Sequence, residues 1–335
     1  MSKRTRYFMI GAVAFLVLGL SIGTVAYYNG GFKVLTQGGG PAELQYVPEN
    51  AVVVAFANVQ QIMNSEFRQR MKQLEAGKSE RGQQEFRDQT GIDIEKDIDT
   101  VVAYMTPDPA DASKPSGVVM ATGRFNVQQI SDFVKLKGGT VGEHRGKPFI
   151  TFSSPQAQGD SGALAFLSNR QVALGSADAV RRTVDLAVGQ VPAADVTKNA
   201  KMMDLIARVD SGNAWVVGRF DALKSQAHLP QQVTSQIPPI SWFSASSSID
   251  GGLKGQLSVE AASSEAAGNL MKVVEGLKGL AALQAQSNNV PSQLQQVLNS
   301  LQLERSGETL TLSFSIPSDV LNGLVMFGKP GAPKK

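Results

Sequence analysis

The stretch Ala51–Ile62, with the sequence AVVVAFANVQQI, contains the pattern on which the fold is built. Its first half is an apolar run rich in valine, which is typical of a buried strand. Asn58 follows the run, and because asparagine is a preferred N-cap residue, we expect a helix to begin directly after it. Apolar side chains then recur at roughly helical spacing, at Ile62, Phe67, Met71 and Leu74. The stretch therefore predicts a strand followed by a helix.

The same junction of strand and helix occurs twice more. The apolar run at 118–121 leads through Gly-Arg-Phe to Asn126, and residues 126–130 repeat the letters NVQQI of residues 58–62. A third apolar run, at 215–217, leads through the same three letters to an aspartate. These echoes indicate an internal duplication.

Two later pairs of apolar runs extend the repeat. The runs at 164–167 and 171–174 resemble those at 301–303 and 310–314, and each pair ends in a serine followed by a helical pattern. Both halves then have the order strand, helix, strand, strand, helix, strand, strand, helix. The alternative is chance, because short identities arise where junctions converge on the same capping residues.

The duplication predicts an α+β fold. We expect one N-terminal transmembrane helix followed by a duplicated unit of mainly antiparallel sheet with packed helices, similar to split βαβ folds. The first repeat unit is expected at 46–190 and the second at 191–327, because a short Gly- and Pro-containing segment separates two helices there. A leucine and valine stripe at 265–285 predicts a core helix on the second sheet.

The composition excludes several chemistries. The 335 residues include no cysteine and only two histidines, which excludes disulfides, zinc–thiolate sites, iron–sulfur clusters and cysteine nucleophiles. A hydrophobic fraction of 42% with a charged fraction of 18% is typical of a chain that folds around a core. We expect a globular protein without a cofactor.

The net charge of +3 comes from the ends of the chain. Three of the 32 Lys and Arg residues, Lys3, Arg4 and Arg6, precede the first apolar segment, and no Asp or Glu occurs before Glu43. The rest of the chain therefore contains 29 cations and 29 anions. Three of those cations lie in the basic tail, 328–335. A body with this balance lacks the general attraction that phosphate backbones require, so we expect no nucleic-acid partner.

Residues 7–28 form an uncharged run with aromatic residues at both ends. As a helix, this run would be roughly 33 Å long, which is enough to span a bilayer. The cations of residues 1–6 then place the N-terminus in the cytoplasm and the rest of the chain outside it. The Gly-rich segment 29–45 is expected to be a tether. A cleaved signal peptide, with Thr24–Ala26 as the cleavage site, is the alternative.

Gly19 and Gly23 have the spacing that lets two membrane helices approach closely. Helix contact through these glycines, and with it a homodimer, is one hypothesis. The other is that the glycines reflect the ordinary composition of membrane helices.

The segment GDSG, residues 159–162, has the core of the nucleophile motif of chymotrypsin-like serine proteases. Such an enzyme also needs a histidine base held by a buried aspartate, and His144 lies in no matching motif. Glycine, aspartate and serine are also common in hairpin turns. We therefore expect Ser161 to belong to a turn and no residue to be catalytic.

Four carboxylates alternate at 93–99, which raises the question of a cation site. A calcium loop of the EF-hand type needs glycine at its sixth position and glutamate at its twelfth, where this chain has isoleucine and tyrosine. We therefore expect no metal site and instead a capped turn that leads into a strand. The rejected candidate ligands are Asp93, Glu95, Asp97 and Asp99.

Arg124 and Arg219 occupy equivalent places in two of the strand and helix junctions. Arginines beside helix N-termini can bind anions, so this pair is a candidate anion contact. The alternative is that they are solvated strand ends repeated by the duplication.

Two short segments resemble membrane-anchored bacterial extracytoplasmic protein families of unknown function. They are VPENA at 47–51, directly before the valine run, and GID at 91–93 with Asp97 and Ile98. The resemblance implies a location and a fold, and these families have no established activity to transfer.

We therefore expect a single-pass, membrane-anchored extracytoplasmic binding or scaffold protein of the bacterial cell envelope that is not an enzyme. Its partners would be the lipid bilayer, through residues 7–28, and another envelope protein. Its location would be the bacterial inner membrane, with the C-terminal domain periplasmic or extracellular. The alternatives are an envelope hydrolase that uses Ser161 or the acidic cluster at 93–99, and a receptor domain for a small ligand.

Overall fold

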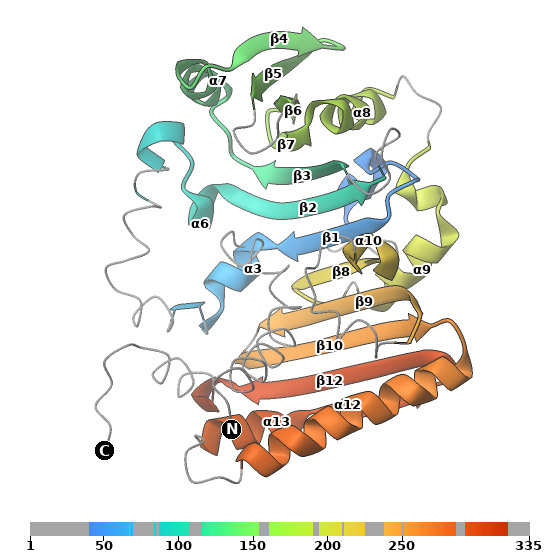
Figure 1. Ribbon diagram of the computed structural model, residues 1–335. Coiled ribbons are helices and arrows are strands. Elements are labelled where there is room, and N and C mark those ends of the chain that lie inside the picture. The colour runs from blue at the N-terminus through green and yellow to red at the C-terminus, as the bar shows by residue number, and fades with distance from the viewer. Residues whose placement is uncertain are drawn as a thin grey trace. The chain divides into compact units, whose positions relative to one another are not determined.

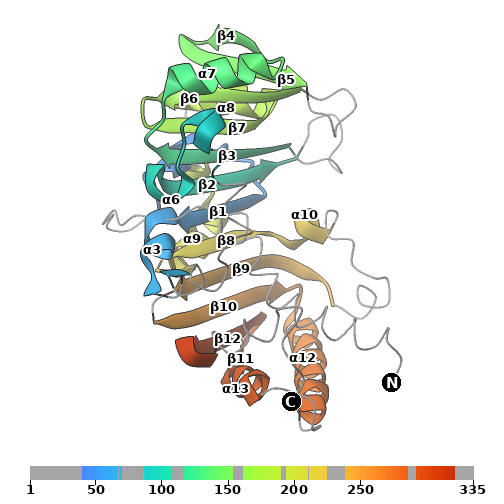
Figure 2. The same cartoon turned by 90° about the vertical axis from the view of Figure 1, so that its left-hand side faces the viewer.

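The computed structural model describes most of the chain between residues 40 and 320 (Figures 1 and 2). The described residues form two compact units. The N-terminal unit holds those of 40–64 and 84–218, and the C-terminal unit holds those from Arg219 onward together with four residues after Asn64. The described ranges are 40–66, 68–69, 84, 87–107, 116–153, 161–189, 194–209, 211–224, 238–249, 251–285 and 292–320.

The N-terminal unit combines eight strands with short helices. Its strands are β1 (Val53–Asn58), β2 (Ile98–Thr106), β3 (Ser116–Gly123), β4 (Thr140–His144), β5 (Lys147–Ser153), β6 (Ser161–Ser168), β7 (Gln171–Ser176) and β8 (Ala214–Arg219). Its helices are η1 (Ala42–Tyr46), α3 (Val59–Asn64), α6 (Ile94–Asp97), α7 (Val127–Leu136), α8 (Ala177–Ala187), η2 (Val196–Lys198) and α9 (Ala200–Val209).

These eight strands pair in the order β8-β1-β2-β3-β7-β6-β5-β4, and each neighbouring pair is antiparallel. β1 therefore has partners on both edges, because Ala55 lies opposite Ala103 of β2 and Val216 of β8. Phe56 also stacks on Trp215 across the β1 and β8 pair, with ring centroids 5.6 Å apart. The valine run that opens the sequence pattern is thus an inner strand of the sheet.

The junction after β1 has the predicted cap. The Asn58 side-chain oxygen accepts a hydrogen bond from the Gln61 N–H at 3.3 Å, and α3 begins at Val59. The second copy behaves in the same way, because Asn126 accepts from the Gln129 N–H at 3.1 Å and α7 begins at the next residue. A side-chain acceptor satisfies one of the free N–H groups of a first helical turn, which confirms the reading of both asparagines as caps.

Helices α7 and α8 lie on opposite faces of this sheet. Side chains alternate between the two faces along each strand, and the register places Ile150 and Phe166 on one face and Tyr104 on the other. Ile130 of α7 packs with Ile150 and Phe166. The Tyr104 hydroxyl lies 2.6 Å from the Thr183 hydroxyl of α8. The sheet is thus buried from both sides in this part of the unit.

The C-terminal unit has four strands, in the order β11-β12-β10-β9, and its neighbouring strands are antiparallel. The strands are β9 (Ile240–Ile249), β10 (Gly252–Ala261), β11 (Gln302–Ser306) and β12 (Thr309–Pro317). Its described helices include α10 (Phe220–Lys224), α12 (Ser264–Ala285) and α13 (Ser292–Ser300).

The two units share one connectivity. In each, an antiparallel strand pair (β2 and β3, or β9 and β10) precedes a helix (α7 or α12), and a later strand (β7 or β12) then pairs with the second strand of that pair. The strand just before it in the chain (β6 or β11) pairs with its other edge. The N-terminal unit adds the hairpin of β4 and β5, which the sequence pattern did not predict.

The connection of split βαβ folds occurs in both units. In such a fold, two strands joined by a helical crossover are parallel but lie on either side of a third strand, so neighbouring strands remain antiparallel. Here β10 and β11, which α12 and α13 connect, both pair antiparallel with β12. In the same way β3 and β6, with α7 between them in the chain, both pair antiparallel with β7. The described residues hold twelve antiparallel strands with a few helices. The period of apolar residues identifies a strand but does not encode which strands are its neighbours, so the order of the strands in the sheet was not predicted.

The predicted fold class also included an N-terminal transmembrane helix, and this part is corrected. In the described part of the chain, no helix combines the length and the apolar composition needed to cross a membrane. Residues 7–28 lie outside the described residues, as do residues 1–6 and 29–39 and the tail at 328–335. The structure therefore gives no support to a transmembrane helix, a signal anchor or a single-pass topology.

The buried Tyr104 hydroxyl makes a testable contribution to stability. Burial raises the pKa of Tyr104 to about 12, from an ordinary value near 10. The unfolded chain therefore releases this proton at a lower pH than the folded chain does, so stability falls as pH rises from about 10 to 12, by roughly 2 to 3 kcal/mol.

We expect Tyr104→Phe to remove this pH-dependent component. Thr183 keeps its own bond to the Ala179 carbonyl, so at pH 8 the variant should lose only about 1 kcal/mol. Urea unfolding of both proteins across this pH range measures the difference, which should shrink or change sign above about pH 10. A difference that stays constant across the range would contradict the assignment.

Candidate functional site

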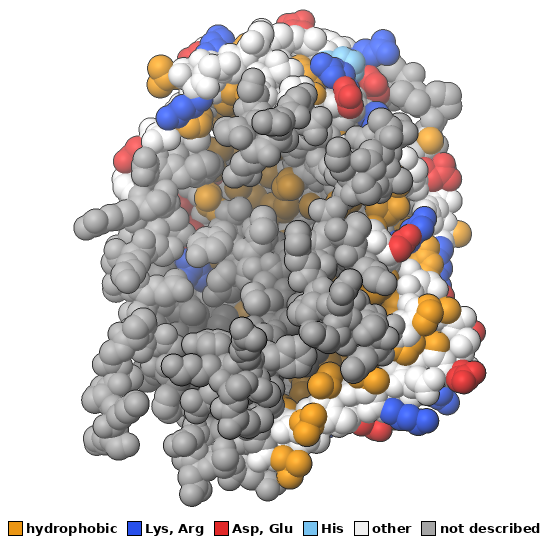
Figure 3. Space-filling view, in the orientation of Figure 1, with side chains coloured by type: hydrophobic (Ala, Val, Ile, Leu, Met, Phe, Trp, Pro, Cys, Tyr) orange, Lys and Arg blue, Asp and Glu red, His pale blue; other side chains and the backbone are white. Residues whose placement is uncertain are grey.

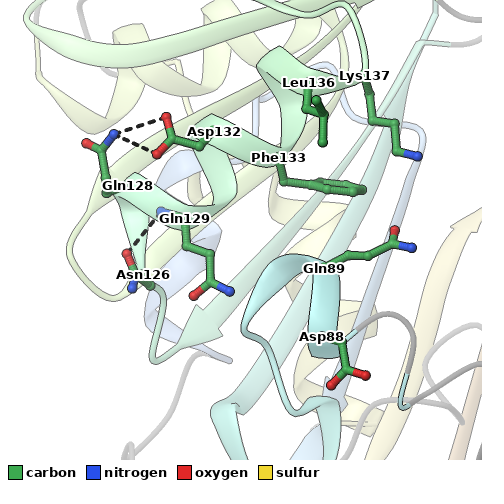
Figure 4. A pocket seen from close by; sticks show the side chains of 9 residues that line it. All are labelled: Asp88, Gln89, Asn126, Gln128, Gln129, Asp132, Phe133, Leu136 and Lys137. Carbon is green, nitrogen blue, oxygen red and sulfur yellow. Dashed lines mark hydrogen bonds between the residues drawn. The ribbon is translucent and has the colours of Figure 1, made fainter.

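A groove of about 740 Å³ runs beside α7 in the N-terminal unit (Figure 4). One wall is the outward side of α7, and the other is the helical segment 87–90. Since α7 has ten residues, the groove extends along roughly 15 Å of helix. The residues that line it are Asp88, Gln89, Asn126, Gln128, Gln129, Asp132, Phe133, Leu136 and Lys137.

The sequence of α7 explains why this side of the helix is open. Val127, Ile130 and Val134 recur at helical spacing and pack toward the sheet. Phe133 is only partly buried, and Leu136 is rotated further around the helix, where its side chain is 83% exposed. The helix therefore fixes a leucine at the surface beside a half-buried aromatic ring.

Polar side chains in the groove are held by local contacts. The Gln128 amide donates to both Asp132 oxygens, at 3.0 and 3.1 Å. The Lys137 ammonium lies 5.6 Å from the centre of the Phe133 ring, which is within the range of a cation–π contact. Gln129 lies against Gly91, where φ is +74° and a Cβ atom would come within 2.3 Å of the Gln129 side-chain oxygen. The two walls thus meet at a position that requires glycine.

The groove can bind but offers little for catalysis. Seven of its nine lining residues are polar, and the neutral ones are amides, which neither accept nor release protons near neutral pH. The same amides carry a donor and an acceptor each, as a peptide backbone does. In the described part of the chain, nothing positive indicates a catalytic site.

The acidic cluster forms the predicted capped turn. Asp93 is the N-cap of α6 and accepts from the Glu95 N–H at 3.1 Å, while Asp97 accepts from the Asp93 N–H at 2.8 Å. Asp99 lies on β2, is nearly buried and pairs with Arg170. Among the residues that the structure describes, no three His, Asp or Glu side chains are grouped to hold a metal ion.

The charge of Asp93 is stabilised by its neighbours. Burial opposes ionisation, but Lys96 at 3.1 Å and Arg87 at 3.3 Å, together with the N–H at the cap, outweigh it. The pKa of Asp93 is therefore lower than its ordinary value. Its role is to hold α6 rather than to take part in proton transfer.

The two arginines of the candidate anion contact each face a carboxylate. Arg124 Nη2 lies 3.1 Å from Asp97 and also donates to the Lys96 carbonyl. Arg219 Nε donates to Asp221 at 3.1 Å, and this bond lowers the pKa of Asp221 and raises that of Arg219. An added anion would have to compete with these carboxylates, and the anion contact stays a prediction.

Ser161 and His144 lie far apart on the same sheet. Ser161 is opposite Ser153 of β5, whereas His144 is opposite Lys147 of β5. Six residues of strand separate these two positions, which corresponds to about 20 Å. His144 instead contacts Asp185 of α8 at 2.9 Å. His144 therefore cannot act as a base for Ser161.

Sequence reasoning did not find the groove. The pattern predicted a helix after Asn126 but not its open side, although Leu136 lies 160° around the helix from Val134 at 100° per residue. This angular offset was the sequence signal that could have revealed the exposed side of the helix. The predicted membrane-orienting residues Lys3, Arg4 and Arg6, and the predicted helix contact Gly19 and Gly23, lie outside the described residues.

Comparisons with known proteins identify no family. No family model matches the chain, and no curated protein has a matching sequence. Crystal form III of TP0453 is similar over 88% of this chain and 99% of that one, with a TM-score of 0.47 and 10% identity. Crystal form I of TP0453 is similar over 85% and 97%, with a TM-score of 0.46 and 10% identity. A likeness at this level transfers no function.

Arg124→Ala distinguishes a structural arginine from an anion contact. Because Arg124 is exposed and already paired, we expect its loss to lower the free energy of unfolding by at most about 1 kcal/mol. Millimolar phosphate, at constant ionic strength, should raise the melting temperature equally in the wild type and the variant. Arg208→Ala, which removes a helix-surface arginine paired with Asp204, is the matched control. A phosphate effect that disappears only in Arg124→Ala would favour the anion contact.

Proposed function

We propose that this chain is a non-catalytic binding protein and that the groove beside α7 receives a segment of a partner protein. The observation that carries the proposal is the position of Leu136, which is held 83% exposed next to Phe133 in a groove otherwise lined by polar groups. A partner side chain that covered these two residues would remove apolar surface from water, which favours association.

The shape of the groove supports a peptide over a small ligand. Pockets for small molecules bury most of the ligand's surface, whereas this groove is open to solvent. An extended peptide supplies its own apolar side chain for Phe133 and Leu136. Its backbone can hydrogen-bond to the amides of Gln89 and Gln129.

The charges of the groove favour peptides that carry a basic side chain. Asp88 and Asp132 contribute two carboxylates, but Asp132 lies 3.7 Å from Lys135, so Asp88 is the carboxylate that remains for a partner. A basic side chain beside an apolar one would therefore complement the groove.

The hydrolase alternative has less support, because the register separates Ser161 from His144 and the carboxylates of the acidic cluster hold a turn. The predicted envelope location rests on residues outside the described range and stays a prediction.

Panning a library of random displayed peptides on the full chain tests the proposal. We expect enrichment of peptides that contain a bulky apolar residue next to Lys or Arg. In Leu136→Glu the affinity of an enriched peptide should fall about tenfold or more, since burying a leucine contributes roughly 1.5 to 3 kcal/mol. Fluorescence anisotropy with a labelled peptide measures the loss.

The matched control is Leu283→Glu, which introduces the same charge at another exposed leucine, in the C-terminal unit. Its affinity for the peptide should equal that of the wild type. Thermal melting should show that both variants remain folded, as expected for exposed positions. If no peptide is enriched, or if Leu136→Glu binds the enriched peptides as well as the wild type does, the groove is not the binding site.

A further inference from the structure

Lys137 is the one cation among the described residues that line the groove beside α7. It ends the helix and follows Phe133 by four residues, about one helical turn, so its side chain passes over the aromatic ring. The ammonium lies 5.6 Å from the ring centre, and this contact holds the charge at the groove. Figure 3 shows cationic and hydrophobic side chains close together at the upper left of the surface, where α7 lies in Figure 1. The groove thus presents a positive charge beside its apolar residues.

The charge of Lys137 is not neutralised by the part of the chain that the structure describes. Among the described residues, none makes a hydrogen bond or an ion pair with its ammonium. Lys135, two residues earlier, differs because Asp132 lies 3.7 Å from it. An ammonium has three N–H donors, and the Phe133 ring faces only one side of the group. Lys137 could therefore donate to a carboxylate while it stays over the ring.

The groove holds its opposite charge on the other wall. Asp88 accepts a hydrogen bond from the Gln84 amide at 3.0 Å through one carboxylate oxygen, which leaves the second oxygen for a partner. Asp88 and Lys137 form no ion pair with each other, and Figure 4 shows the Phe133 ring between them. A segment whose apolar side chain covers the ring would therefore meet a positive charge on one side of that residue and a negative charge on the other.

The alternative is that Lys137 serves only the helix. A cation at a helix C-terminus is stabilised by the helix dipole, and Lys137 is the C-cap of α7. This role affects the stability of the chain and is indifferent to the charge of a bound segment. A role in recognition instead makes the affinity depend on the charge of the segment. The two roles are therefore distinguished by changing the peptide as well as the protein.

We propose that Lys137 binds a carboxylate of the partner segment, so that the segment carries an acidic group on one side of its apolar residue and a basic side chain on the other. This inference rests on the proposed peptide groove and names the second charge that its partner carries. An anion beside Lys137 and a cation beside Asp88 complement both charges of the groove at once. The carboxylate belongs either to an Asp or Glu side chain or to the C-terminus of the segment.

The test uses the full chain and a labelled peptide enriched by panning, synthesised in three forms. The first form is unchanged, with a free C-terminus. The second has Asn and Gln in place of every Asp and Glu, and the third has a C-terminal amide. By fluorescence anisotropy, we expect the wild type to bind either the second or the third form about three- to fivefold more weakly than the first, which is the range for an exposed ion pair. A loss with the second form assigns the carboxylate to a side chain, and a loss with the third assigns it to the C-terminus.

Lys137→Gln completes a double-mutant cycle. It should bind the unchanged peptide about three- to fivefold more weakly than the wild type does, and it should bind the form that lacks the recognised carboxylate as the wild type does. Lys137→Arg keeps the charge and should retain the affinity. Lys198→Gln is the matched control, because it removes an exposed lysine of the same unit that lies outside the groove, and its affinities should equal those of the wild type.

The outcomes separate this inference from the function on which it rests. If Leu136→Glu weakens binding while the wild type binds all three forms equally, the groove is the peptide site but Lys137 recognises no carboxylate, which would overturn this proposal alone. An equal loss in Lys137→Gln for all three forms would also overturn it, because packing and helix stability act without regard to the charge of the peptide. If no peptide is enriched, the proposed groove and this inference fail together.

Discussion

Backbone hydrogen bonding along both edges of β1 is the constraint on which the N-terminal unit depends. The strand pairs with β2 on one edge and with β8 on the other, so its amide and carbonyl groups are satisfied without water. Its valines are buried as well, so the strand leaves neither an edge nor an apolar surface to solvent at its start. The position of β1 determines where the helix after it begins and where β2 and the strands beyond it lie. In the sequence, β1 is recognised by its valine-rich run, which is also the first element of the repeat.

The sequence predicted the elements well and their partners poorly. Valine runs and asparagine caps are local signals, so β1, β3, α7 and the turn at Asp93 were found from neighbouring residues. Strand direction and order depend on contacts between residues far apart in the chain. Local periodicity does not contain that information, so the strand order and the β4 and β5 hairpin were not predicted. The groove was missed for a similar reason, because its second wall at 87–90 lies across from α7 only in the folded chain.

The charged residues that stand out in the sequence stabilise local structure, whereas the proposed binding surface contains mostly neutral residues. Asp93, Asp97 and Arg124 hold α6 and the end of β3 together. The exposed leucine of the groove, Leu136, has no comparable structural role. This division explains why the charged residues that stand out in the sequence do not mark the proposed binding groove.

The pairing of β1 with β8 also has a consequence during synthesis. Ala55 and its partner Val216 are 161 residues apart, whereas β2 and β3, β4 and β5, and β6 and β7 are joined by short connections. At ribosomal rates of about 5–20 residues per second, β8 emerges roughly 8 to 30 seconds after β1. During that interval one edge of an apolar strand has no partner, while the hairpins that follow it can already form. The nascent chain therefore passes through a period of exposure to wrong strand pairing, which ends when Trp215 emerges and stacks on Phe56.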